Sequence, residues 1–397
     1  MRIVYIVPRY WPSLGGAQNL AREVVQRMSH LHEVRVITQF TADNDSFVAS
    51  VSNPVSTQYF DGNVPVHRIG PSGLWQPLVQ KLAKFYGMIR PVNPIFAYAL
   101  NQSLVHQFVT ILQGYKPDIV HTVHIGLVYS SETAFAAAQL CDIPFVWTPV
   151  PHIEGAGWSG KRFRRLYRTA DALIAMTGRE KAWLIEQGAA QERVYVIPPG
   201  LTQPPASDAQ RFRASHQVGD APVVLFVGQK LPYKGFAQLA AAAPIVWEQM
   251  PETRFVFIGP RNPESEQFFQ TQTDPRILEM GAVDELEKNS ALAACDVFCM
   301  PSTHESFGIV YLEAWNFRKP VVGAKIDALE EVIDSGTDGL LVAQTPEAIA
   351  DALLRLLNDS TLRQSFGEAG YAKVRQRYDW DKLIQQMNSV YTSLLPH

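Results

Sequence analysis

Short apolar runs, rich in β-branched and aromatic residues, recur along the first half of the chain, and each is followed by a stretch of helical periodicity. The runs are RIVYIV, EVRVIT, PDIVHTV, PFVWTPV, ALIAM and VYVIP. Strands that are apolar on both faces and alternate with helices are typical of parallel sheets covered by helices on each side. The sequence therefore predicts an α/β fold of the doubly wound, Rossmann-like type.

The pattern starts again after a polar, proline-containing interval at residues 199–222. The later runs are VVLFVG, RFVFIG, VFCMP, PVVGA and GLLV, separated by helical segments such as TPEAIADALLRLLND. Two such series predict two domains, at 1–203 and 204–379, followed by an amphipathic helix at 380–397 that can pack on either domain. Open parallel sheets bind ligands outside the carboxyl ends of their strands, so we expect the site in a cleft where the two domains face each other.

Composition restricts the function without naming it. The chain has 397 residues, a formal net charge of −3 and three cysteines, Cys141, Cys295 and Cys299. The charge gives no bias toward nucleic acid, and the cysteines are too few and too apolar in setting for a disulfide framework. The amino terminus lacks an apolar leader, and no apolar run reaches the roughly 20 residues of a membrane span. We expect a cytoplasmic protein that binds no nucleic acid.

One segment is strongly basic. KRFRRLYR contains Lys161, Arg162, Arg164, Arg165 and Arg168. Such a run forms either a solvated helix face or a dock for phosphate groups and lipid heads. Both interpretations stay open, and the second predicts contact with the inner face of a membrane.

Two carboxylates, Glu305 and Glu313, stand in the otherwise apolar stretch STHESFGIVYLEAW. An unpaired carboxylate on a mostly buried helix is costly to desolvate, so each needs a polar partner. One interpretation is a pair of ligand contacts at a helix end. The alternative for Glu313 is an ion pair with a nearby Lys or Arg in the core.

The same stretch predicts a phosphate-binding helix end. Ser306 is suited to cap a helix, which leaves the amides of residues 307–309 pointing outward. Gly308 lets an anion approach the backbone closely. The three amides expected to face the anion belong to Phe307, Gly308 and Ile309.

HESFGIVYLEA resembles the E-x7-E element of retaining, two-domain nucleotide-sugar glycosyltransferases, the glycogen-synthase-like family 4 with the GT-B fold. Other segments resemble that family in the same order along the chain: SLGGAQ, IPPG, VGQKLPYKG, GAVDELEKNSALAACDVFCMPS and KPVVGAKIDALEEVIDSGTDGLLV. A series of motifs in order is more specific than any of its members. The resemblance implies a retaining glycosyltransferase with an N-terminal acceptor domain, a C-terminal donor domain and a last helix that returns to the first domain.

The resemblance also implies roles on the donor side. Glu313 would hold the ribose hydroxyls of the nucleotide, and Glu305 a hydroxyl of the donor sugar. Lys234 would place a point charge on the diphosphate, together with the helix amides. Gly16, which with Gly15 precedes a helix directly after the first strand, lies where a backbone can reach a phosphate or an acceptor.

On the acceptor side the implied residues are Gly15 and Gln18. His152, just past a strand end, resembles the histidine that lines the sugar site in this family. The alternatives are a plain turn for the glycines and a surface histidine for His152.

Four positions depart from the family pattern, and one of them is Gln18, which stands where the family usually has glutamate. Gln229 stands where the family usually has arginine, and Asp327 and Ala328 stand where it usually has two glycines. The loss of the arginine removes a bidentate phosphate donor, and we expect the adjacent Lys230 to supply its charge. The departures keep two rivals open: a nucleotide-sugar epimerase and a binding protein with impaired catalysis.

We expect no cofactor besides the nucleotide sugar, and no metal. His121 and His124 have a spacing that metals use but no third ligand nearby. The tripeptides DND at 43–45 and DWD at 379–381 match a metal-binding pattern of other glycosyltransferases, but neither lies near the donor motifs.

Overall fold

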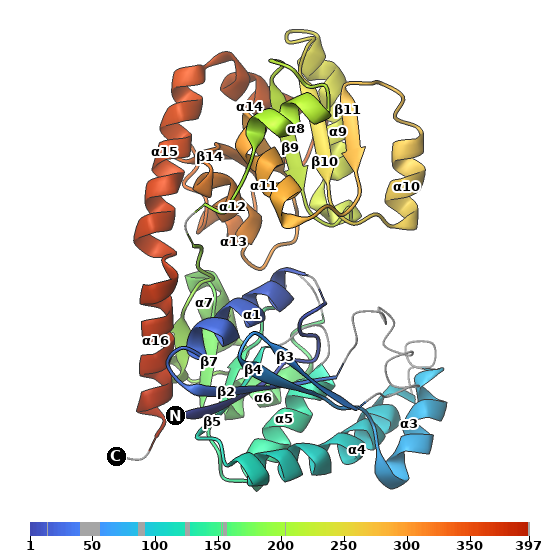
Figure 1. Cartoon of the computed structure of the whole chain (residues 1–397), viewed down its shortest axis with the longest axis vertical. Coiled ribbons are helices and arrows are strands. Elements are labelled where there is room, and N and C mark those ends of the chain that lie inside the picture. Colours follow the sequence, from blue (N-terminus) through green and yellow to red (C-terminus); the bar gives the residue numbers. More distant parts are fainter. Residues whose placement is uncertain are drawn as a thin grey trace. The chain divides into compact units, whose positions relative to one another are not determined.

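A computed structural model describes residues 1–13, 15–39, 56–85, 92–123, 128–151, 153, 157–202 and 204–395. The chain divides into two compact units (Figure 1). Unit 1 contains Met1–Ile197 and Ile384–His397, and unit 2 contains Pro198–Leu383. The sequence predicts the division between the two domains at 203/204 and the start of the last helix at 380.

Unit 1 is built on an eight-stranded sheet in the order β3-β4-β2-β1-β5-β6-β7-β8, in which β3 and β4 form the one antiparallel pair. Its strands are β1 (Arg2–Ile6), β2 (Glu33–Thr38), β3 (Thr57–Asp61), β4 (Val64–Arg68), β5 (Ile119–Val123), β6 (Phe145–Thr148), β7 (Ala172–Ala175) and β8 (Val194–Val196). Its helices are α1 (Gly16–Met28), α3 (Gln76–Ala83), α4 (Val92–Tyr115), α5 (Val128–Leu140), α6 (Lys161–Thr169) and α7 (Gly178–Glu186), with short 3-10 turns η1 (Gly73–Trp75) and η2 (Gln191–Arg193).

Unit 2 is built on a six-stranded, fully parallel sheet in the order β11-β10-β9-β12-β13-β14. Its strands are β9 (Val223–Val227), β10 (Arg254–Ile258), β11 (Ile277–Met280), β12 (Val297–Met300), β13 (Val321–Ala324) and β14 (Gly339–Val342). Its helices are α8 (Ala209–Ser215), α9 (Phe236–Trp247), α10 (Pro263–Gln270), α11 (Glu285–Ala294), α12 (Ile309–Asn316), α13 (Asp327–Glu330), α14 (Pro346–Asn358) and α15 (Ser360–Arg377), with the 3-10 turn η3 (Pro232–Lys234). The last helix, α16 (Trp380–Ser393), begins in unit 2 and continues into unit 1.

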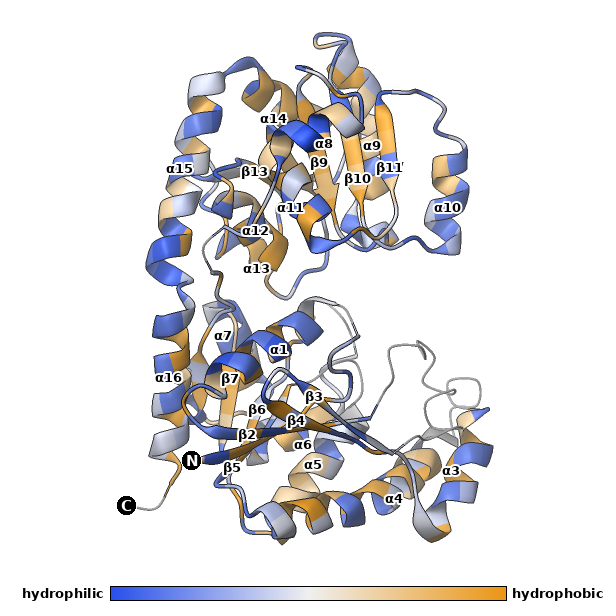
Figure 2. Ribbon diagram, in the orientation of Figure 1, coloured by the Kyte–Doolittle hydropathy of each residue, from blue (hydrophilic) through white to orange (hydrophobic). Residues whose placement is uncertain are grey.

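The α/β prediction is confirmed, because every apolar run that we assigned to a strand forms one. In β5 and β9 all five residues are buried, as expected of strands covered on both faces. Figure 2 shows β9, β10 and β11 as hydrophobic, while α8 carries hydrophilic residues. Among the described residues, no helix is long and apolar enough to cross a membrane.

Three strands were not predicted, and all lie at or near a sheet edge. β11 is the edge strand of unit 2, and each of its residues is only partly buried. β3 and β4 are joined by a tight turn at Gly62, whose φ is 60°. Strands at an edge need fewer apolar residues, so their sequences lack the continuous apolar runs of central strands.

The part of α16 that belongs to unit 1 is held by a buried polar network. The hydroxyl of Tyr391 lies 2.8 Å from that of Tyr5 and 2.5 Å from Nδ1 of His121, whose Nε2 lies 2.8 Å from Oγ1 of Thr148. Burial lowers the pKa of His121 to about 3, so the imidazole is neutral. His121, whose spacing from His124 is one that metals use, therefore anchors the last helix to β5 and β6.

We expect Tyr391→Phe to lower the free energy of unfolding by about 1–3 kcal/mol, because it leaves the buried Tyr5 hydroxyl and His121 ring without their shared partner. Urea denaturation followed by tryptophan fluorescence measures this change. Tyr371→Phe is the matched control, since that ring packs against the guanidinium of Arg318 at 3.8 Å and keeps this contact without its hydroxyl. Equal stabilities of the two variants would contradict an anchoring role for the network.

Candidate functional site

Two loops of unit 2 leave the sheet side by side, because β9 and β12 are neighbouring parallel strands. The amide of Thr303, after β12, donates to the carbonyl of Tyr233, after β9, at 2.9 Å. The side-chain amide of Gln344 donates to the carbonyls of Tyr233 at 3.1 Å and Pro301 at 2.5 Å. The loops therefore form one surface at the carboxyl edge of the sheet, where ligands of parallel sheets bind.

The two loops approach each other most closely at Gly235, which follows η3. Its φ is 79°, in the left-handed region, and a Cβ at this position would lie 2.6 Å from the carbonyl oxygen of Pro301. Any larger residue would be strained and would push the β12 loop away. Gly235 thus fixes the position of its neighbour, Lys234, against the β12 loop.

Lys234 and Glu305 form an ion pair across these loops. Nζ of Lys234 lies 2.5 Å from Oε1 of Glu305, although the two residues are 71 apart in sequence. Glu305 is 6% exposed. The polar partner that Glu305 requires is therefore the lysine expected to act on the same ligand.

Glu313, on α12, is paired with Lys288 of α11 at 3.1 Å. Lys288 also contacts Glu285 at 3.1 Å. Burial alone would lower the pKa of Lys288, but the negative charges of Glu313 and Glu285 outweigh it and raise that pKa above its ordinary value. The alternative that Glu313 forms an ion pair is thus observed, and Lys288 is a residue of the candidate site that the sequence did not single out.

The start of α12 differs from our prediction. The helix begins at Ile309, and its cap is Gly308 rather than Ser306, with φ 82° and ψ 57°. A Cβ on Gly308 would lie 2.6 Å from the ring of Tyr311, so the left-handed cap requires glycine. Phe307 precedes the cap, and its buried ring packs against Tyr378.

The first amides of α12 still have no acceptor within the helix, as at every helix start. The set that can face an anion therefore begins after Phe307 and includes Ile309. No side chain caps this helix start, because the left-handed backbone turn at Gly308 itself directs the amides outward. Sequence reasoning missed this because Ser306 and Gly308, on either side of Phe307, are both of a residue type that is favoured as a helix cap.

The expectation that Lys230 replaces the family arginine does not fit its geometry. The side chain is fully buried, and Nζ lies 2.8 Å from Glu279 and donates to the carbonyls of Gly259 and Met280 at 2.6 Å each. An ammonium group has three N–H donors, and these three acceptors occupy them. Burial lowers the pKa of Lys230 despite the hydrogen bond to Glu279. Lys230 ties the loops together and has no donor left for a phosphate.

Arg261, after β10, is a further cation at this edge that the sequence did not single out. It forms a two-point contact with Glu279, with Nε 2.9 Å and a terminal nitrogen 2.8 Å from Oε2, and its side chain is 47% exposed. Glu279 therefore lies between Lys230 and Arg261. Its position on β11, an unpredicted strand, explains why the sequence gave no signal for this cluster.

Two other departures from the family pattern, Gln229 and Asp327, are exposed at the same edge. Gln229 is exposed in the loop after β9. Asp327 is exposed at the start of α13, in the segment after β13, while Ala328 is buried. The arginine that the family usually has is thus replaced by an uncharged side chain, and a carboxylate stands near the carboxyl end of β13.

In unit 1, the helix α1 begins at Gly16, and Gly15 is its cap in extended conformation. A Cβ on Gly16 would meet nothing within 4 Å, so the backbone there is open. The side chain of Gln18 folds back over Gly15, with Oε1 2.4 Å from a Cβ built on it. His152 and His124 lie outside the described residues, as does Asp43–Asp45.

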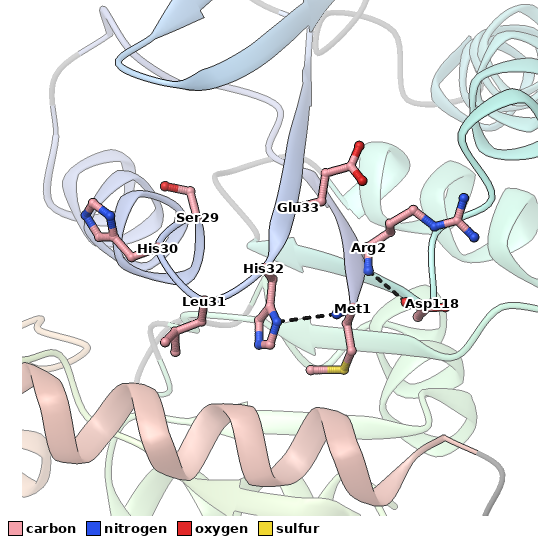
Figure 3. A pocket seen from close by; sticks show the side chains of 8 residues that line it. All are labelled: Met1, Arg2, Ser29, His30, Leu31, His32, Glu33 and Asp118. Atoms are coloured by element: carbon pink, nitrogen blue, oxygen red, sulfur yellow. Dashed lines mark hydrogen bonds between the residues drawn. The ribbon is translucent and has the colours of Figure 1, made fainter.

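A shallow hollow of unit 1, of about 610 Å³, lies at the opposite edge of its sheet (Figure 3). It is lined by the starts of β1 and β2, including Arg2 and Glu33, and by His30, His32 and Asp118. The amide of Arg2 donates to Asp118 at 2.7 Å. Because ligands of parallel sheets bind at the carboxyl edge, this hollow carries no functional assignment.

Across the described ranges, no group of three or more His, Cys, Asp or Glu side chains is placed to hold a metal ion. Asp379 serves instead at the start of α16, where its Oδ1 accepts from the amides of Asp381 at 3.0 Å and Lys382 at 3.3 Å.

Solved structures share the fold over nearly the whole chain. The Anabaena protein HepE, solved with UDP-glucose, has a TM-score of 0.77 at 18% identity and covers 99% of this chain and 100% of its own. The sucrose-phosphate synthase of Thermosynechococcus elongatus has a TM-score of 0.77 at 20% identity, with 99% of each chain covered. Both likenesses establish the GT-B type of fold and nothing finer.

Family profiles and relatives agree with the fold. "Glycosyl transferase 4-like domain" matches residues 15–200, and "Glycosyl transferases group 1" matches residues 208–373. The phosphatidyl-myo-inositol mannosyltransferase of Mycobacterium tuberculosis is 32% identical over 228 residues, 56% of this chain and 59% of that protein, so the match spans about three fifths of that relative. The D-inositol 3-phosphate glycosyltransferase of Xylanimonas cellulosilytica is 31% identical over 308 residues, 69% of this chain and 71% of that protein. With its motif series, its two parallel sheets and these matches, the chain belongs to the group 1 glycosyltransferases of the family 4 type.

Proposed function

We propose that this protein transfers a sugar from a nucleotide-diphosphate sugar to an acceptor hydroxyl, with retention of the anomeric configuration and without a metal ion. The observation that carries the proposal is the Lys234–Glu305 ion pair, held at the carboxyl edge of the unit 2 sheet beside the start of α12. The cation and the helix amides at this edge suit the diphosphate and the negative charge that it gains as it leaves. The carboxylate suits a hydroxyl of the donor sugar.

Each ion pair of the site has a defined place in this reaction. Sugar transfer passes through an oxocarbenium-like state, and negative charge grows on the departing diphosphate. Lys234 shifts from Glu305 to that diphosphate, which frees the Glu305 carboxylate to accept a hydrogen bond from a sugar hydroxyl. Glu313 accepts hydrogen bonds from the ribose hydroxyls, while Lys288 holds the Glu313 carboxylate in place. Ion pairs that exist before binding limit the cost of desolvating these charges.

The charge on the diphosphate is supplied by Lys234 and the α12 amides, and no metal is assigned to the site. Lys234 is a mobile point charge, whereas the missing arginine would have been a planar fork. We therefore propose that the donor is held less by bidentate contacts than in relatives with arginine at the position of Gln229. The nucleotide sugar is the co-substrate, and no further cofactor is proposed.

For the acceptor we propose a polyol or sugar hydroxyl, free or carried by a lipid. The names of two relatives support this: one is a D-inositol 3-phosphate glycosyltransferase and the other a phosphatidyl-myo-inositol mannosyltransferase. Gly15 and Gln18 at the start of α1 remain proposed for the acceptor side, Gly16 for donor binding, and His152 for catalysis at the sugar site. A cytoplasmic location stays a prediction.

The first prediction separates the two carboxylates. We expect Glu313→Gln to weaken binding of the free nucleoside diphosphate about 10- to 100-fold, as the loss of a charge-assisted hydrogen bond does. Glu305→Gln should leave that affinity unchanged and lower turnover of the sugar donor. Isothermal titration calorimetry and steady-state kinetics measure the two effects.

Glu285→Gln is the matched control for this experiment, because Glu285 pairs with the same Lys288 but is not assigned to the ribose. Its affinity for the nucleotide should equal that of the wild type. An equal loss in Glu285→Gln and Glu313→Gln would show that both act through Lys288 alone. A loss of nucleotide affinity in Glu305→Gln only would reverse the two roles.

The second prediction distinguishes two lysines of one loop. Lys234→Gln should lower kcat by about 10²- to 10³-fold, because it removes one charge-stabilising donor, and should also lower the free energy of unfolding, because it leaves the buried Glu305 carboxylate without its cation. Lys230→Met should lower the free energy of unfolding by about 1–3 kcal/mol, because two buried carbonyls lose their donor. Kinetics at a temperature where both variants are folded, with urea denaturation alongside, separates these outcomes.

Gln229→Arg completes the comparison and tests the rival function. If Lys234 and the amides suffice, restoring the arginine should change turnover by less than about ten-fold. An inactive wild type that binds a nucleotide sugar and gains turnover in Gln229→Arg would favour a binding protein with impaired catalysis, the alternative suggested by Gln229 and Asp327.

The third prediction concerns the reaction course. In a buffer that contains EDTA, the first-formed glycoside should keep the anomeric configuration of the donor, and the rate should equal that without EDTA. Proton NMR of the anomeric coupling during the first turnovers measures both. An inverted product would refute retention, and loss of turnover that magnesium or manganese restores would refute the metal-free mechanism. An isomerised nucleotide sugar formed without acceptor would favour an epimerase.

A further inference from the structure

Unit 1 exposes a group of large apolar side chains on η1 and α4, which we call the apolar cluster: Leu74, Trp75, Ile95 and Tyr98. Leu74 is 99% exposed, and Ile95 and Tyr98 are 56% and 57% exposed. The rings of Trp75 and Tyr98 meet edge to face, with centroids 5.5 Å apart. Ile95 and Tyr98 are three residues apart, so they share one face of α4. Side chains of this size gathered in one place mark an interaction surface rather than ordinary scatter.

A groove of about 430 Å³ adjoins this cluster between α4, α5 and α6. Tyr98 belongs to both features, since it also lines the groove. Three cations of α6, Lys161, Arg162 and Arg165, line the opposite wall. We call this feature the basic groove.

The surroundings of the apolar cluster and basic groove are poor in negative charge. The helix α6 carries five cations and no carboxylate, and no Asp or Glu occurs in the sequence between Asp61 and Asp118, which covers α3 and α4. Lys81 on α3 and Lys84 after it are exposed. Glu132 lines the groove as its one acidic residue and is paired with Arg162 at 3.0 Å. The face is therefore apolar at one side and cationic at the other, which complements an anionic surface.

One buried polar atom also points to a ligand in the groove. Oδ1 of Asn101 is shielded from solvent and has no hydrogen-bond partner among the described residues, and Asn101 lines the groove beside Tyr98. A buried acceptor without a donor is costly. A hydroxyl group bound in the groove next to the cations would satisfy it.

We propose that the apolar cluster and the basic groove together dock unit 1 on an anionic lipid bilayer, with a lipid phosphate bound by Lys161 and Arg165. Aromatic and aliphatic side chains flanked by lysine and arginine are suited to the boundary between acyl chains and head groups. Anionic lipids attract each nearby cation, and Trp and Tyr are favoured at that depth. The head-group hydroxyl reaches Asn101. This surface goes beyond glycosyl transfer, and its binding to lipid needs neither donor nor acceptor.

Vesicle flotation with the full chain tests the proposal. Two vesicle types are compared at equal total lipid: phosphatidylcholine alone, and phosphatidylcholine with phosphatidylglycerol. We expect binding to the anionic vesicles, weakened by salt, and at least 10-fold weaker binding to the zwitterionic ones. Equal binding to both types, or binding to neither, would overturn the proposal.

Variants locate the surface. Lys161→Glu with Arg165→Glu should weaken binding at least about 10-fold, and Ile95→Ser with Tyr98→Ser should weaken it while leaving its salt dependence intact. The control is Lys116→Glu with Lys382→Glu, which reverses two exposed charges, one beyond the far end of α4 and one in unit 2. An equal loss in the control would show that net charge, and not this face, decides binding.

Two further outcomes decide between occupants of the same face. If the wild type dimerises by light scattering and Ile95→Ser with Tyr98→Ser makes it monomeric without affecting flotation, a second copy covers the apolar cluster and the proposal is wrong. Thermal melting of each variant confirms folding. Because flotation requires no sugar transfer, a protein that floats but has no transferase activity would refute the proposed function and leave the docking surface standing.

Discussion

The parallel pairing of β9 with β12 is the constraint on which the candidate site depends. It brings the loop after each strand to the same edge of the sheet, and Gly235 lets those loops touch, because a Cβ there would meet the Pro301 carbonyl at 2.6 Å. This contact, together with the hydrogen bond from Thr303 to Tyr233, brings Lys234 and Glu305, 71 residues apart, within 2.5 Å of each other. The chemistry proposed for the site is therefore a consequence of strand order before it is a property of any one side chain.

Each carboxylate of the E-x7-E element has a lysine partner, Lys234 for Glu305 and Lys288 for Glu313. An unpaired carboxylate among buried side chains would be destabilising, so these pairs reconcile a stable fold with charges kept for a ligand. Under the proposed function, donor binding exchanges one partner for another rather than exposing a bare charge. The same residues then serve stability in one state and recognition in the other.

A second cluster at this edge has the opposite character. Lys230, Glu279 and Arg261 join the loops after β9 and β10 to β11, and the lysine is fully buried with its donors occupied. Such a cluster holds a loop in place and is poorly suited to release a charge during a reaction. Unit 1 also contains both kinds of polar group. The buried His121 holds α16 in place, whereas the cations of α6 line an open groove.

Periodicity alone determined the class of fold, since apolar runs in central parallel strands are a local property of the sequence that burial on both faces enforces. The motif series likewise predicted that Glu305, Glu313 and Lys234 belong to one donor site, and the structure pairs Lys234 with Glu305. Edge strands such as β11 were not predicted, because a partly exposed strand does not need a continuous apolar run. Which of two lysines four residues apart is buried with its donors occupied, and whether Ser306 or Gly308 caps α12, was decided only by tertiary structure. Backbone turns at Gly235 and Gly308 direct these side chains and amides, and the acceptors that occupy Lys230 come from strands distant in sequence.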